Sequence, residues 1–96
     1  MHVRWWRMGV VLEWEAQPHT WSLHVRAKTE RKARSLVADR VAADFPGAPH
    51  LVHTCEPSDP LLKVANEERI AADFGPYKRS WDDPVLARFP RDLSAN

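Results

Sequence analysis

Cysteine and glycine are both scarce in this chain of 96 residues. The one cysteine, Cys55, cannot form a disulfide within the chain, and no CxxC pair is present to indicate a zinc or redox site. The three glycines form none of the GxxxxGK, GxGxxG or GxSxG motifs that bind phosphates or carry a nucleophilic serine. These absences argue against nucleotide-dependent enzymes and serine hydrolases, and they leave packing as the source of stability.

Long apolar runs and an excess of one charge are missing as well. No uninterrupted apolar run exceeds three residues, whereas a membrane span needs roughly 18, and the N-terminus lacks the apolar stretch of a signal peptide. We therefore expect a soluble, cytoplasmic protein that has no membrane partner. The 14 basic and 13 acidic side chains leave a formal net charge of +1, which disfavours generic binding to polyanions.

Two segments of alternating polarity predict a β-hairpin. The even positions from Trp6 to Trp14 are all apolar, and a second alternation over residues 20–28 places Trp21 and further apolar residues on one face. Period 2 with tryptophan and valine is typical of strands. Residues 16–19, which include Pro18, are expected to form the loop of an antiparallel hairpin with one buried face.

The period changes after Thr29, a residue type that caps helix N-termini. Apolar residues at spacings of three and four, from Ala33 to Phe45, predict a helix over residues 30–45 that packs on the sheet. The sequence Pro-Gly-Ala-Pro that follows ends this helix. A short third strand is expected over residues 51–55.

A second helix is predicted over residues 60–74. Asp59 is suited to its N-cap, Pro60 to its first position, and the Gly-Pro pair that follows Phe74 to its end. Its last residues, Arg-Ile-Ala-Ala-Asp-Phe at 69–74, nearly repeat Arg-Val-Ala-Ala-Asp-Phe at 40–45. We interpret this echo as two similar helix C-termini, because six residues are too few for a structural repeat.

Together these elements predict an α+β fold, in which a small, three-stranded antiparallel sheet in the order β-β-α-β carries one packed helix and a second helix. Residues 1–76 are expected to form a single domain, since a chain of this length can bury only one core. Residues 77–96 then form an extended C-terminal arm. The arm keeps large apolar residues, Trp81 and Phe89 among them, so we expect it to pack on the domain or to bind a partner.

The densest charge cluster is basic and lies where the second strand leads into the first helix. This basic cluster consists of Arg26, Lys28, Arg31, Lys32 and Arg34, five cations within nine residues. Cations are unfavourable near a helix N-terminus, because the macrodipole is already positive there. Two interpretations stay open: a phosphate or carboxylate site that also uses helix amides, and a solvated face that serves solubility.

Tryptophan is abundant, with five in the chain. Trp6, Trp14 and Trp21 have the parity of the buried face, so we expect them in the core. Trp5 has the opposite parity, which places it with Arg7 on the open face of the sheet. There it is a candidate to stack on a base or to anchor a protein contact. We favour a third arrangement, in which the C-terminal arm covers Trp5, because exposed apolar patches are uncommon on small monomers.

Five histidines raise the hypothesis of a metal site, which their spacing does not support. On a regular strand His53 and Cys55 share a face and His50 points away, so the three side chains do not converge on one ion. A lone cysteine in a small domain is more often a buried apolar residue than a nucleophile. We therefore predict no metal, no cofactor, no catalytic residue and no enzymatic activity.

The function predicted from the sequence is that of a small non-enzymatic interaction protein, an inhibitor, adaptor or accessory subunit of the kind that phages and mobile elements often encode. It binds a larger protein or a protein–nucleic-acid complex through Trp5, Arg7, the basic cluster and the arm. The alternative is a nucleic-acid-binding module that uses the basic residues of segment 26–34.

Overall fold

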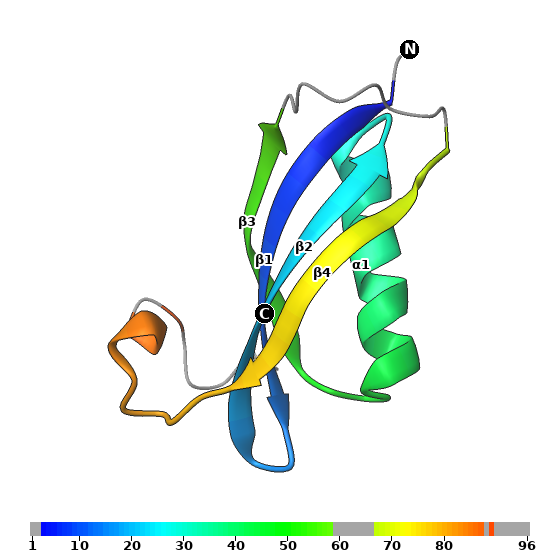
Figure 1. Cartoon of the computed structure of the whole chain (residues 1–96). Coiled ribbons are helices and arrows are strands. Elements are labelled where there is room, and N and C mark those ends of the chain that lie inside the picture. The colour runs from blue at the N-terminus through cyan, green and yellow to red at the C-terminus, as the bar shows by residue number, and fades with distance from the viewer. Residues whose placement is uncertain (1–2, 59–66, 88, 90–96) are drawn as a thin grey trace.

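The computed structural model describes residues 3–58, 67–87 and 89, and it shows a four-stranded antiparallel sheet with one helix across one face (Figure 1). The elements are β1 (Arg4–Trp14), β2 (Gln17–Ala27), α1 (Glu30–Asp44), β3 (His50–Ser58), β4 (Arg69–Lys78) and the short 3-10 turn η1 (Pro84–Leu86). In space the strands lie in the order β3-β1-β2-β4. The predicted α+β class is confirmed, but the sheet has one strand more than expected. None of the helices in the described part of the chain is long and apolar enough to cross a membrane.

The central hairpin of β1 and β2 has a tighter turn than predicted. Trp14 pairs with Gln17, so only Glu15 and Ala16 lie between the strands. Both have positive φ angles, 54° and 63°, as a type I′ turn requires, because this turn follows the right-handed twist of the two strands. Neither residue is glycine or asparagine, so the sequence contains no signal that marks this turn.

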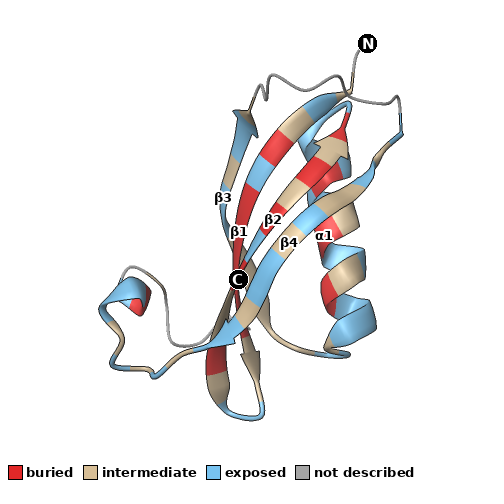
Figure 2. Ribbon diagram, viewed as in Figure 1, coloured by how far each residue is buried: buried red, intermediate tan, exposed pale blue. Residues whose placement is uncertain are grey.

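The apolar alternation of β1 and β2 faces α1 and forms the core (Figure 2). Ala33, Val37 and Val41 of the helix are buried against it. The sheet contributes the following buried residues: Trp6, Met8, Val10, Leu12, Trp21, Leu23, Val25 and Ala27. The predicted cap of α1 is confirmed, since the Thr29 hydroxyl accepts a hydrogen bond from the Lys32 amide at 3.1 Å. This bond satisfies one of the free N–H groups in the first helical turn.

The second predicted helix is wrong over residues 69–74, which belong to strand β4. Residues 60–66 of that prediction lie outside the described residues. β4 pairs antiparallel with β2, for example Ala72 with His24. This pairing gives the backbone groups along the second edge of β2 the hydrogen-bond partners that a central strand needs. Residues 69–74 therefore form a strand paired with β2, although their apolar residues have the spacing of a helix.

The near-repeat at 40–45 and 69–74 is therefore helical in one copy and extended in the other. The two copies meet, because the Arg40 guanidinium donates to Asp44 in its own helix and to Asp73 in β4, each at 2.7 Å. The hydrogen bond with Asp44 is the largest cause that raises the pKa of Arg40, and Asp73 adds to it while partial burial opposes both. Arg40 thus ties the end of α1 to the strand that lies furthest from β3.

The segment that follows β4 folds back over the face of the sheet opposite α1, which we call the outer face (Figure 1). Leu86 is buried there together with Val11 of β1. Three partly buried residues pack around this pair: Leu51, Trp81 and Phe89. The described part of the predicted arm therefore packs on the sheet.

We expect Leu23→Ala to lower the free energy of unfolding by about 2–5 kcal/mol, because it leaves a cavity where a fully buried side chain stood. The measurement is urea unfolding followed by tryptophan fluorescence. Arg31→Ala, at an exposed position of α1, is the control and should change the same free energy by less than about 0.5 kcal/mol. A loss at Leu23 no larger than that of the control would contradict the core described above.

Candidate functional site

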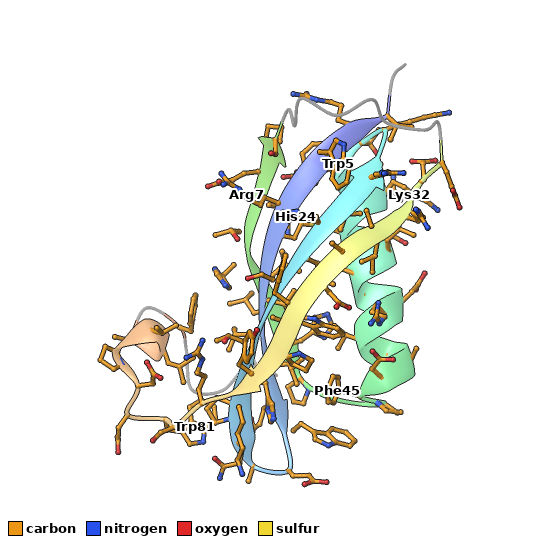
Figure 3. The ribbon with its side chains drawn as sticks, in the orientation of Figure 1. Trp5, Arg7, His24, Lys32, Phe45 and Trp81 are labelled. Atoms are coloured by element: carbon orange, nitrogen blue, oxygen red, sulfur yellow. The ribbon has the colours of Figure 1, made fainter. Side chains whose placement is uncertain are left out.

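Aromatic rings and arginines gather on the outer face, at the end of the sheet where β1 begins (Figure 3). We call this group the aromatic–arginine patch. It consists of Trp5, Arg7, His24, Arg26, Arg69 and Phe74. The strand register places Trp5 opposite Arg26, and Arg26 opposite Arg69, so these three side chains lie side by side across β1, β2 and β4.

The aromatic rings of the patch follow one another from strand to strand. The centroids of the Trp5 and His24 rings lie 6.3 Å apart, and those of His24 and Phe74 lie 5.7 Å apart. Both pairs are edge-to-face, the arrangement that the ring quadrupole favours. The Arg26 guanidinium lies 4.8 Å from the Trp5 ring centroid in a cation–π contact. The patch therefore alternates ring surface with positive charge.

The arginines of the patch carry more positive charge than the nearby carboxylates neutralise. Arg7 forms an exposed ion pair with Glu56 at 3.4 Å, and Arg69 has a long one with Glu67 at 3.8 Å. Arg26 has no carboxylate partner among the residues described, and its Nε atom is buried without a hydrogen bond. Arg26 and Arg69 occupy directly opposed positions of β2 and β4, so the patch carries positive charge on both of these neighbouring strands.

Beyond the patch the outer face is hollowed into a groove. Its floor includes the small residues Gly9, Ser22 and Thr54, and the C-terminal segment forms one wall with Val85 and Phe89. Two adjoining cavities, of about 720 Å³ and 260 Å³, share part of this floor. The groove therefore reaches from the aromatic–arginine patch to the C-terminal segment.

Gly9 allows His53 to lie across the floor of the groove. A Cβ atom at position 9 would stand 2.6 Å from His53 Cε1 and 2.7 Å from Thr54 Oγ1. The register between β1 and β3 shifts here, between Gly9 and Val10, so that His53 is the extra residue of a β-bulge. Its ring lies on the outer face, with its centroid 4.5 Å from that of Phe89.

The bulge overturns the expectation that His53 and Cys55 share a face. Cys55 packs against the core on the side of α1, whereas His53 lines the outer groove, so the two cannot act together as nucleophile and base. Burial is the largest cause that raises the pKa of the Cys55 thiol, which keeps the thiol protonated. Within residues 3–58, 67–87 and 89, no three His, Cys, Asp or Glu side chains are placed to hold a metal ion.

The residues of the predicted basic cluster do not lie together, because the sheet separates Arg26 from the cations of α1. Arg26 lies on the outer face, whereas Arg31, Lys32 and Arg34 lie on α1, at the opposite side of the sheet (Figure 3). Lys28 is exposed in the connection between β2 and α1. Of the five cations, Arg26 is the one that joins the aromatic–arginine patch, so segment 26–34 does not form one continuous phosphate site.

The described part of the C-terminal segment covers the far end of the outer face and not Trp5 (Figure 3). Trp81 and Phe89 pack there around Val11 and Leu86. The Trp81 indole N–H also donates to a backbone carbonyl of the hairpin turn at 3.1 Å. The expectation that the arm covers Trp5 is therefore wrong for the residues described, and Trp5 stays partly exposed in the patch.

Besides His24 of β2, sequence reasoning missed three residues of this surface, Arg69, Phe74 and Tyr77. All three lie on β4. The sequence did not predict this strand, because the apolar residues over 60–74 have helical spacing. No clear period-2 signal marks this strand, because Ile70, Ala71 and Ala72 are consecutive apolar residues and a register shift puts Ile70 on the core face and Phe74 on the outer face. The Gly-Pro pair expected to end a helix lies inside this strand, where the register with β2 shifts.

We expect Gly9→Ala to lower the free energy of unfolding by about 1–3 kcal/mol, because the added methyl group displaces His53 and Thr54. Urea unfolding of the single and double variants with His53→Ala should give a coupling energy of about 0.5–3 kcal/mol. Ser22→Ala, at an exposed position of the same floor, is the control and should cost less than about 0.5 kcal/mol. Strictly additive effects at positions 9 and 53 would argue against the close approach described above.

We expect Cys55 to react several-fold more slowly with a dithiobis(nitrobenzoate) reagent in the folded protein than in urea. The thiolate is the reactive form, and burial raises the pKa of this thiol, so less thiolate is present at about pH 8. Since the folded-state pKa is the higher one, the thiol's contribution to stability is complete below the ordinary thiol pKa and declines as the pH rises above it. Equal reaction rates with and without urea would contradict the burial of Cys55.

Comparison with known proteins does not assign a family. The chain matches no family model, no curated protein and no solved structure at a significant level. Its function is therefore inferred from the side chains of the outer face and their geometry.

Proposed function

We propose that this chain is a non-enzymatic interaction protein, an inhibitor, adaptor or accessory subunit, that binds a larger partner on the outer face of its sheet. The observation that carries the proposal is the exposure of large side chains on this face. Phe74, Tyr77 and Val85 are 52%, 55% and 50% exposed. Phe74 belongs to the patch, Tyr77 lies opposite Thr20 of the groove, and Val85 lines the groove. Aromatic residues and arginine are the types enriched at interfaces and their hot spots.

The opposite side of the molecule gives a useful contrast. Among the residues that the structure describes, exposed large apolar side chains occur on β4 and in η1, and none occurs on α1. The exposed side of α1 carries charged and small residues instead, such as Arg31 and Asp39. This asymmetry supports the outer face, and not the helix, as the binding surface.

Two expectations from the sequence belong to this proposal, namely that the protein catalyses no reaction and that it acts in the cytoplasm. The first is supported by the placement of His53 and Cys55 on opposite faces of β3. It is also supported by the protonated state of the Cys55 thiol, whose pKa burial raises.

Site-specific photo-cross-linking in an extract of the source cells tests the proposal. A benzoylphenylalanine replaces Phe74 in one variant and the exposed Asp39 of α1 in the control variant. We expect adducts of higher mass from position 74 that position 39 does not give, because the partner covers the outer face. Nuclease digestion of each adduct, which leaves this chain intact, then shows whether the partner is a nucleic acid.

A competition measurement separates specific binding from random collision. Excess wild-type protein should suppress the adduct at position 74, whereas a competitor that carries Phe74→Ser and Tyr77→Ser should not. Equal adducts from positions 74 and 39, or equal suppression by both competitors, would show that the outer face is not the binding surface.

A further inference from the structure

We infer that the partner held on the outer face is a single-stranded nucleic acid, whose bases stack on Trp5 and Phe74 and whose phosphates are bound by Arg7, Arg26 and Arg69. This inference rests on the proposed function and names the chemical class of the partner at the same site. It differs from the alternative drawn from the sequence, because the arginines that bind come from three strands and the cations of α1 take no part.

The arrangement of the rings supports stacking. Trp5, His24 and Phe74 form a row across β1, β2 and β4, with centroids 6.3 Å and 5.7 Å apart. Tyr77 continues the exposed aromatic surface along β4. The rings stand edge-to-face, at 88° and 70°, so each base would stack on the face of a single ring such as that of Phe74. Unpaired bases can stack in this way because every base has a π-face, whereas the bases of a duplex are already stacked and paired.

The arrangement of the charges supports phosphate binding. Arg26 and Arg69 occupy opposed positions of β2 and β4, and Arg7 lies on the neighbouring strand β1, directly opposite His24. The Arg26 guanidinium lies over the Trp5 ring, and Arg69 has a long ion pair with Glu67. A phosphate oxygen accepts charge-assisted hydrogen bonds from a guanidinium group. Arg79, 5.8 Å from the Tyr77 ring centroid, repeats the combination of ring and cation further along the face.

The groove gives such a strand a continuous path. From Trp5 to Gly9, four residue steps of β1 at about 3.3 Å each span about 13 Å; beyond Gly9 the C-terminal segment covers Val11. The floor along this path includes Gly9, Ser22 and Thr54, and the His53 ring lies over Gly9. Hydroxyl groups on that floor are donors and acceptors that can meet base edges. The dimensions suit a few nucleotides, near the lower end of the roughly 4–16 nucleotides that single-strand-binding domains cover.

The decisive experiment is fluorescence anisotropy with labelled oligothymidylate and oligouridylate of about 12 nucleotides. We expect saturable binding by the full chain, with an affinity that falls linearly in a log–log plot against salt concentration. An abasic strand of equal length carries the same phosphates without bases and should bind more weakly, as should a duplex. Equal binding of the abasic strand would overturn the stacking part of the inference.

Two exposed substitutions and one matched control locate the site. Phe74→Ser should weaken binding about 5- to 150-fold, the effect expected when one stacked base loses its ring. Arg69→Glu should weaken it and lower the salt slope by about 1, because a phosphate contact is lost. Lys32→Glu makes the same change of charge on α1 and should leave the slope unchanged. Urea unfolding of each variant confirms that it is folded.

The outcomes separate this inference from the function on which it rests. Absence of saturable binding to either oligonucleotide at low salt would overturn the inference, as would an equal effect of Lys32→Glu and Arg69→Glu. A cross-linked adduct at position 74 whose mass nuclease leaves unchanged would also overturn it, while it would uphold the outer face as a protein-binding surface. Failure of both the anisotropy and the cross-linking experiments would reject the outer face altogether.

Discussion

The register between β1 and β2 is the constraint on which the rest of the structure depends. Successive side chains of a strand point to opposite faces, so a slip by one residue would exchange the two faces of the hairpin. In the observed register Trp6 lies opposite Val25, which gathers the apolar residues under α1. The same pairing places Trp5 opposite Arg26 on the outer face. The core and the candidate site are therefore two sides of one hairpin.

The two outer strands, β3 and β4, contribute the remaining residues of the candidate site. β4 adds Arg69 and Phe74 to the patch, and Arg40 connects β4 to α1 through a carboxylate on each. β3 contributes His53, which a bulge turns over the small residue Gly9. The C-terminal segment then closes one side of the groove. Each contribution comes from a different part of the chain, so the site exists only when all four strands are paired.

Local charge on the outer face differs from the charge of the whole molecule. The formal net charge is only +1, and two basic residues of α1 form pairs within the helix, Arg34 with Glu30 and Arg40 with Asp44. Arg26 instead lies over the Trp5 ring, at the position opposite Arg69. Near neutrality of a chain therefore does not exclude a local anion site, because the field at a surface depends on which charges are neighbours in space.

The sequence by itself determined the hairpin, helix α1, its Thr29 cap and most of the core, because period 2, helical spacing and a capping hydroxyl are local signals. Segments 40–45 and 69–74 mark the limit of such signals, since nearly identical residues form a helix and a strand. Only tertiary structure decided between them, because the second copy pairs with the edge of β2. The tertiary structure also determined on which face of the sheet His53 lies and that Arg26 and Arg69 occupy opposed positions. Both depend on the pairing of strands that are distant in the sequence, and the spacing of residues along the chain does not encode that pairing.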